Sequence, residues 1–121
     1  VDKMKSFLHS LNKYFPDKKK VFLVAFKTDK NIKDMVSEIE EYADEIIFSE
    51  FSVSTDMSKN PSFKISNLKS QISNRSNFYF EKDSRKALVD SLSFAQSIPE
   101  SIVVITGSLY FVGEIRRVLL S

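Results

Sequence analysis

Two short, uninterrupted apolar runs, residues 21–26 and 102–105, constrain the fold of this chain most. Each run is bounded by polar residues and is too short for a buried helix, which is typical of strands covered on both faces of a parallel sheet. Each leads through a polar turn into a segment whose apolar residues recur at helical spacing. The sequence therefore predicts βα units in a parallel, helix-covered sheet, with residues 102–105 buried on both faces.

The other periodic segments extend this alternation along the whole chain. The predicted helices cover 2–14, 32–42, 65–72, 84–95 and 109–119, and the predicted strands cover 21–26, 45–51, 77–80 and 102–105. Asp83 is expected to cap the fourth helix, in which Leu92 is expected to face inward. This order predicts a single α/β domain over residues 1–121, a Rossmann-like, three-layer domain with a mostly parallel sheet and helices on both faces.

Composition narrows the possible functions. Hydrophobic residues make up 42% of the chain and 11 residues are Phe, which indicates a folded globular unit. The absence of cysteine excludes disulfides and thiolate metal sites, and the net charge of +2 does not favour a nucleic-acid partner. The basic run 18–20 is interpreted as a solvated loop and His9 as a surface residue. No apolar run approaches a membrane span, so we expect a cytoplasmic protein without membrane contact.

The turn Thr106-Gly107-Ser108 is the first candidate site, because the carboxyl ends of parallel strands are where open α/β sheets bind ligands. Gly107 permits a positive φ or a close backbone approach. Gly113, inside the following helix, is expected to let that helix lie close to the sheet. An ordinary turn with Ser108 or Thr106 capping a helix explains the same residues, and the two interpretations stay open here.

The polar loop 27–31 is the second candidate. Thr28, Asp29 or Asn31 can cap the helix that follows, which is the purely structural interpretation. A helix start also attracts anions, and Lys30 adds a full positive charge there.

The series of elements begins on a helix that no strand precedes, and the first residue is Val1. A helix of this type normally follows a strand in a βα unit. We therefore expect the chain to be a fragment of a larger protein.

One block of residues carries a family resemblance. This block is Val104-Ile-Thr-Gly-Ser-Leu-Tyr-Phe-Val-Gly-Glu-Ile-Arg116. Asp29-Lys30 follow the earlier strand, and Met35 lies in the helix after them. Together these residues resemble the carboxyl-terminal domain of folylpolyglutamate synthase or the bifunctional dihydrofolate synthase of the Mur ligase superfamily. The likeness in element order extends over nearly all of the chain.

The resemblance implies an ATP-dependent carboxylate–amine ligase in folate and one-carbon metabolism. In that family ATP phosphorylates a folate carboxylate, and the amino group of glutamate attacks the acyl phosphate. The implied parent enzyme uses ATP and Mg²⁺, whereas this chain has no Gly-x-x-x-x-Gly-Lys-[Ser/Thr] phosphate loop. We expect the chain alone to be inactive, monomeric and free of bound cofactor, with an ATP-binding domain missing from its amino-terminal side.

Carried over by position, the resemblance gives binding roles to five residues. Ser108 would hydrogen-bond the incoming glutamate, with Tyr110 nearby. Thr28, Asp29 and Lys30 would lie beside the same cleft, and Lys30 suits a substrate carboxylate. The resemblance places no catalytic residue and no metal ligand within this chain.

The chain departs from the family pattern in a further respect, and its residues also allow two other functions. The family often has Pro-Arg-Ala after the strand that we predict at 45–51, whereas residues 51–54 contain no arginine. The Asp-Gly-Ala-His-Asn turn that opens this domain in the family would fall immediately before Val1, which supports the expectation of a fragment. A stand-alone α/β binding or interaction domain is the alternative function, with Thr-Gly-Ser as a cap and Asp-Lys as surface charge. A nucleotide-binding oxidoreductase fragment is disfavoured because Gly-x-Gly-x-x-Gly is missing.

Overall fold

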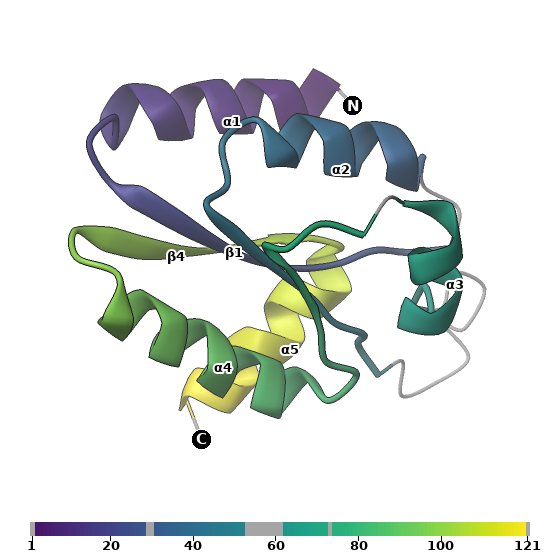
Figure 1. The fold of residues 1–121 in the computed structure, drawn as a ribbon. Coiled ribbons are helices and arrows are strands. Elements are labelled where there is room, and N and C mark those ends of the chain that lie inside the picture. The colour runs from purple at the N-terminus through teal and green to yellow at the C-terminus, as the bar shows by residue number, and fades with distance from the viewer. Residues whose placement is uncertain (1, 29–30, 53–61, 73, 121) are drawn as a thin grey trace.

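A four-stranded sheet forms the middle layer of the structure, and all of its strand pairs are parallel (Figure 1). The computed structural model describes residues 2–28, 31–52, 62–72 and 74–120. The strands are β1 (Lys19–Ala25), β2 (Glu45–Phe48), β3 (Phe78–Phe80) and β4 (Ser101–Gly107), in the spatial order β3-β2-β1-β4.

Helices cover both faces of this sheet, as Figure 1 shows. The helices are α1 (Asp2–Tyr14), α2 (Ile32–Glu40), α3 (Ile65–Gln71), α4 (Ser84–Ser97) and α5 (Leu109–Leu120). One core cluster joins the sheet to α1, α2 and α3, and a second joins its other face to α4 and α5. The predicted three-layer α/β fold is therefore confirmed.

Strand β1 shows why its sequence is apolar without interruption. It lies inside the sheet, where Phe22 and Val24 enter the first core cluster and Val21 and Leu23 enter the second. Successive side chains of a strand point to opposite faces, so a strand covered on both sides needs apolar residues at every position.

Strand β4 differs from the sequence prediction. Within the described residues it pairs only with β1, so it is an edge strand, and Val104 is its one fully buried residue. The prediction that 102–105 is buried on both faces was wrong because an apolar run does not reveal whether its strand is central or at an edge. Strand β2 also ends at Phe48, three residues earlier than predicted, although the chain stays buried through Phe51.

The basic run 18–20 is only partly the solvated loop that was predicted. The Lys20 side chain is 4% exposed, and its ammonium donates to the carbonyl oxygens of Phe15 and Lys18, each at 3.1 Å. It thereby satisfies carbonyl groups just after the end of α1, where a helix leaves acceptors unpaired. His9 is exposed, as expected.

Two helix predictions need correction. Leu92 of α4 is 43% exposed, whereas Ser91 is buried and donates its hydroxyl proton to the Ala87 carbonyl at 2.7 Å. Gly113 of α5 does not serve close packing on the sheet, because an added Cβ would meet only the Arg117 guanidinium, at 3.8 Å. The cap predicted at Asp83 is confirmed, since its carboxylate accepts the first free N–H groups of α4.

Candidate functional site

The ends of β1 and β4 form one side of the carboxyl edge of the sheet. Ala25 pairs with Gly107 in the register of these strands, and the Ser108 N–H donates to the Ala25 carbonyl at 2.9 Å. Gly107 has a φ of +111°, and a Cβ built on it would lie 2.2 Å from the Ala25 oxygen. Only glycine combines this backbone conformation with this contact, so the turn depends on Gly107.

Ser108 begins α5 from a buried position. The residue is 5% exposed, its hydroxyl oxygen accepts the Tyr110 N–H at 3.1 Å, and its carbonyl accepts the Val112 N–H at 3.0 Å. These bonds make Ser108 the N-cap of α5, which is the structural role that the sequence allowed. Its hydrogen bond to a substrate stays a prediction, for which the hydroxyl proton remains the available donor.

Tyr110 lies beside this turn with its ring between two partners. Its ring stacks on Phe51 with centroids 6.1 Å apart, and the Lys27 ammonium lies 5.3 Å from the centroid of the Tyr110 ring. Tyr110 is 41% exposed and Thr28 is exposed. These contacts link the loop after β1, the loop after β2 and the start of α5.

Two of the predicted site residues, Asp29 and Lys30, lie outside the residues that the structure describes. The helix that follows them, α2, has Asn31 as its N-cap residue without a capping side-chain hydrogen bond. The Asn31 amide instead donates to the Asp34 carboxylate at 2.7 Å. The capping role considered for Asn31 is therefore not what its side chain does.

A pocket of about 780 Å³ lies on the other side of the same edge, where β2 and β3 end. It is lined by Glu50, Phe51, Ser52, Ser62, Lys64, Glu81, Lys82, Asp83, Ser84 and Glu114. None of the described residues that were predicted to bind glutamate, Thr28, Ser108 and Tyr110, lines it. Phe51 joins the two areas, because it lines the pocket and stacks on Tyr110.

Glu114 of α5 holds two walls of this pocket together. One of its carboxylate oxygens accepts the Ser52 N–H at 2.8 Å, and the other accepts the Ser84 hydroxyl proton at 2.5 Å. Ser52 belongs to the loop after β2, and Ser84 is the first residue of α4. A single side chain of α5 thus fixes two loop ends that come from different strands.

Glu50 provides the buried acid of the pocket. It is 8% exposed, accepts the Ile65 N–H at 3.1 Å and lies 3.7 Å from the Lys64 ammonium. These contacts attach the start of α3 to the end of β2. Close by, the Ser62 hydroxyl accepts the Phe51 N–H at 3.0 Å.

The acids that follow β3 are also paired. The Glu81 carboxylate accepts the Asp83 N–H at 3.1 Å and lies 3.2 Å from the Lys86 ammonium. Hydrogen bonds and charge from Glu81 and then Asp90 raise the pKa of Lys86, which keeps that amine protonated. Asp83 is engaged in capping α4.

Sequence reasoning missed this pocket, although part of it carried a usable signal. Glu81 directly follows β3 and Glu50 comes two residues after the end of β2, and positions after neighbouring parallel strands meet at one edge of a sheet. Lys64 and Glu114 carried no such signal, because Lys64 precedes α3 and Glu114 belongs to α5, and the position of both helices relative to the edge depends on the whole fold.

Across residues 2–28, 31–52, 62–72 and 74–120, no group of three or more His, Cys, Asp or Glu residues is arranged to hold a metal ion. The acids of the pocket are already bonded to backbone N–H groups, hydroxyls or lysines.

Over the same ranges, no helix has the length and apolar character that crossing a bilayer requires.

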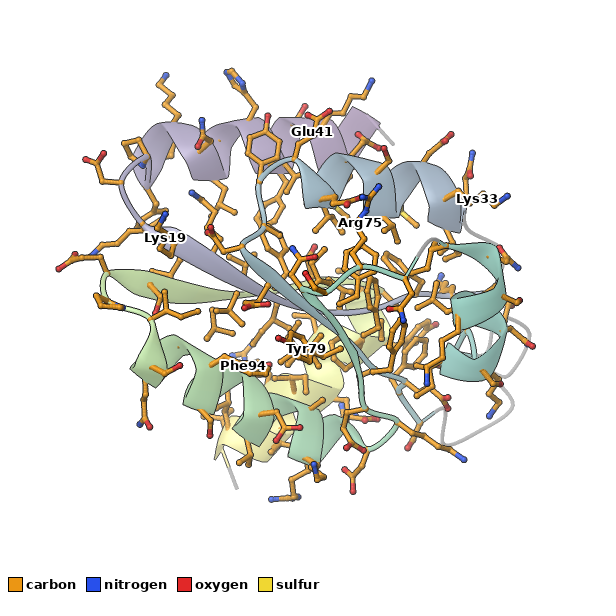
Figure 2. All side chains as sticks on the ribbon, viewed as in Figure 1. Lys19, Lys33, Glu41, Arg75, Tyr79 and Phe94 are labelled. Atoms are coloured by element: carbon orange, nitrogen blue, oxygen red, sulfur yellow. The ribbon has the colours of Figure 1, made fainter. Side chains whose placement is uncertain are left out.

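A titrating pair lies away from the pocket, on the face covered by α4. Burial raises the pKa of the Glu45 carboxyl above its ordinary value of 4.5, a hydrogen bond from the Tyr79 hydroxyl opposes this rise, and the charge of Asp44 adds to it. The centroids of the Tyr79 and Phe94 rings lie 4.6 Å apart. Figure 2 shows the two labelled side chains close together near α4. Glu45 is thus a half-buried acid whose charged form is disfavoured.

The comparisons with known proteins agree with this geometry. A family model described as "Dihydrofolate synthetase, C-terminal domain" matches residues 1–118. A search of curated protein sequences found no match.

Solved structures with the same fold were also found. One is a bifunctional folylpolyglutamate synthase/dihydrofolate synthase from Yersinia pestis, complexed with AMPPNP and Mn ion. Its sequence is 15% identical and its TM-score is 0.77, and the match covers 98% of this chain and 26% of the Yersinia pestis chain. The Mycobacterium tuberculosis folylpolyglutamate synthase complexed with ADP and AMPPCP is 16% identical with a TM-score of 0.79, over 94% of this chain and 26% of that one. The chain thus spans about a quarter of these relatives.

Proposed function

This chain belongs to the family of dihydrofolate synthetase C-terminal domains, and from this premise we propose that it is the carboxyl-terminal domain of an ATP-dependent ligase that adds glutamate to a folate. The match over residues 1–118 is the observation that carries the proposal. Because the chain spans about a quarter of its structural relatives, we also propose that the whole enzyme has a separate ATP-binding domain. The family match favours this function over a stand-alone interaction domain.

The proposed reaction proceeds through an acyl phosphate. Hydroxide is a poor leaving group, so a carboxylate oxygen of the folate first takes the terminal phosphoryl group of ATP, and ADP is released. The amine nitrogen of glutamate then attacks the carbonyl carbon and loses a proton, while the C–O bond to phosphate breaks. The products are an amide, ADP and phosphate, and Mg²⁺ bound outside this domain would offset phosphate charge.

In this proposal the carboxyl edge of the sheet presents glutamate to the other domain. Open α/β sheets bind ligands at this edge, and both the turn at Ser108 and the pocket lie there. Ser108, Tyr110 and Thr28, with Asp29 and Lys30, are proposed to bind and orient glutamate without acting on the reacting atoms.

The proposal is tested on the whole enzyme by measuring ADP release. We expect release that requires both a reduced folate and glutamate, and a cooperative melt without turnover for the 121-residue chain alone. Turnover by the chain alone would contradict the two-domain proposal. ADP release by the whole enzyme that ignores glutamate would contradict the ligase and leave the stand-alone binding domain as the better account.

A further inference from the structure

Six charged side chains line the pocket at the ends of β2 and β3, and five of them have internal partners. Glu50 pairs with Lys64, Glu81 with Lys86, Asp83 with the first N–H groups of α4, and Glu114 with Ser52 and Ser84. The sixth is Lys82. Among the described residues, no hydrogen bond or ion pair engages its ammonium group.

The backbone on both sides of Lys82 is fixed. The Glu81 N–H donates to the Phe48 carbonyl at 2.9 Å and so continues the pairing of β3 with β2. On the other side, the Asp83 carboxylate accepts the Arg85 N–H at 2.9 Å and anchors the start of α4. The Lys82 residue is exposed, so a fixed backbone carries a free cation at the rim of the pocket.

The charges of the pocket select the class of ligand. A free ammonium group at a fixed rim binds a carboxylate through a charge-assisted hydrogen bond. The four acids are bonded internally but still carry negative charge, so they disfavour a ligand that has carboxylates and no compensating cation. An amino acid, which carries an ammonium group of its own, satisfies both conditions.

We propose that Lys82 binds the side-chain carboxylate of the incoming glutamate and thereby sets the preference of the ligase for an acidic amino acid. This assignment rests on the proposed function and adds to it a residue that the sequence did not single out. It places glutamate between the Lys82 rim and the Ser108 turn, with Phe51 between the two. Lys82 is a binding residue here and takes no part in bond formation.

The test compares Lys82→Gln, Lys82→Arg and the control Lys13→Gln in the whole enzyme. Lys13 lies near the end of α1, on the face of the sheet opposite α4, so its substitution makes the same charge change away from the pocket. Glutamate is varied at saturating ATP and folate, and ATP is varied at saturating glutamate.

For Lys82→Gln we expect KM for glutamate to rise about ten- to a hundredfold, the range for a lost hydrogen bond to a charged group. KM for ATP and the melting curve should stay unchanged, Lys82→Arg should recover most of the loss, and Lys13→Gln should match the unsubstituted enzyme. Glutarate, which lacks the ammonium group, should compete with glutamate less well than D-glutamate does.

Three results separate the failure of this inference from the failure of the proposed function. An active enzyme in which Lys82→Gln leaves KM for glutamate within about twofold overturns the role of Lys82 only. An equal rise in KM for ATP and glutamate overturns it as well, because it indicates general damage to the site. An unsubstituted enzyme without glutamate-dependent ADP release overturns the ligase itself.

Discussion

A Cβ atom on Gly107 would lie 2.2 Å from the carbonyl oxygen of Ala25, its partner in the neighbouring strand. The Gly107 φ of +111° adds a second reason why no other residue fits there. This contact fixes how closely the turn that carries Ser108 approaches the end of β1. The geometry of the candidate site therefore requires a residue without a side chain at position 107, which is glycine.

Gly107→Ala is expected to destabilise the chain strongly, by about 3 kcal/mol or more, because strain and a backbone clash act together. The free energy of unfolding from urea titration measures the effect. Gly113→Ala is the matched control, since an added Cβ there meets only a flexible arginine at 3.8 Å. It should stabilise the chain by up to about 1 kcal/mol. Similar losses at both positions would contradict the close approach at Gly107.

Ser108 combines an observed cap with a proposed binding role, and two substitutions separate them. Ser108→Ala removes the acceptor for the Tyr110 N–H and should cost about 1 kcal/mol of stability. Ser108→Asp keeps a capping oxygen and should retain most of that stability, but its charge repels a substrate carboxylate. In the whole enzyme Ser108→Asp should therefore raise KM for glutamate by more than Ser108→Ala does. Unchanged kinetics in Ser108→Asp would restrict Ser108 to its capping role.

Glu114 and Ser84 should be energetically coupled, because their side chains share a 2.5 Å hydrogen bond between α5 and α4. A double-mutant cycle with Glu114→Ala and Ser84→Ala measures this coupling by urea unfolding. We expect a coupling energy of about 1–2 kcal/mol. Glu114→Ala should also cost more than Ser84→Ala, since it leaves the Ser52 N–H without its acceptor. Strict additivity of the two substitutions would contradict the tether.

Glu45→Gln should stabilise the chain at neutral pH. The pKa of Glu45 is raised in the folded state above its ordinary value of 4.5, so the folded state holds the proton more tightly than the unfolded state. Stability is therefore lost as the pH rises from 4.5 through the folded pKa, and the penalty is complete above it. Glutamine keeps an oxygen for the Tyr79 hydroxyl but carries no charge. Melting curves should differ at pH 7 and converge toward pH 4, and a gap that does not change with pH would contradict the assignment.

The sequence predicted the fold well, because the features that define it are local. The apolar run of β1, the cap at Asp83 and the strand–turn–helix unit at Gly107 are each encoded within a few residues. The edge position of β4 could not be predicted, since it depends on strand order. The burial of Lys20 could not be predicted either, because its partners are carbonyl groups that become available only when α1 ends nearby.

The candidate site was predicted less completely than the fold. The turn singled out Ser108 and the family resemblance added Tyr110, and their binding roles stay predictions, whereas the pocket is assembled from four separate segments. Its rim cation, Lys82, follows a strand of only three residues and stands in the sequence as one lysine among many. Only the parallel pairing of β3 with β2 brings it beside Glu50.

The most direct test of the ligase proposal follows the oxygen atoms of the folate carboxylate through one turnover of the whole enzyme. The carboxylate is labelled with ¹⁸O, and the phosphate released in the presence of ATP and glutamate is analysed by mass spectrometry. An acyl phosphate transfers one labelled oxygen to phosphate for each amide formed, and we predict this result. Amide formation with unlabelled phosphate would contradict the account.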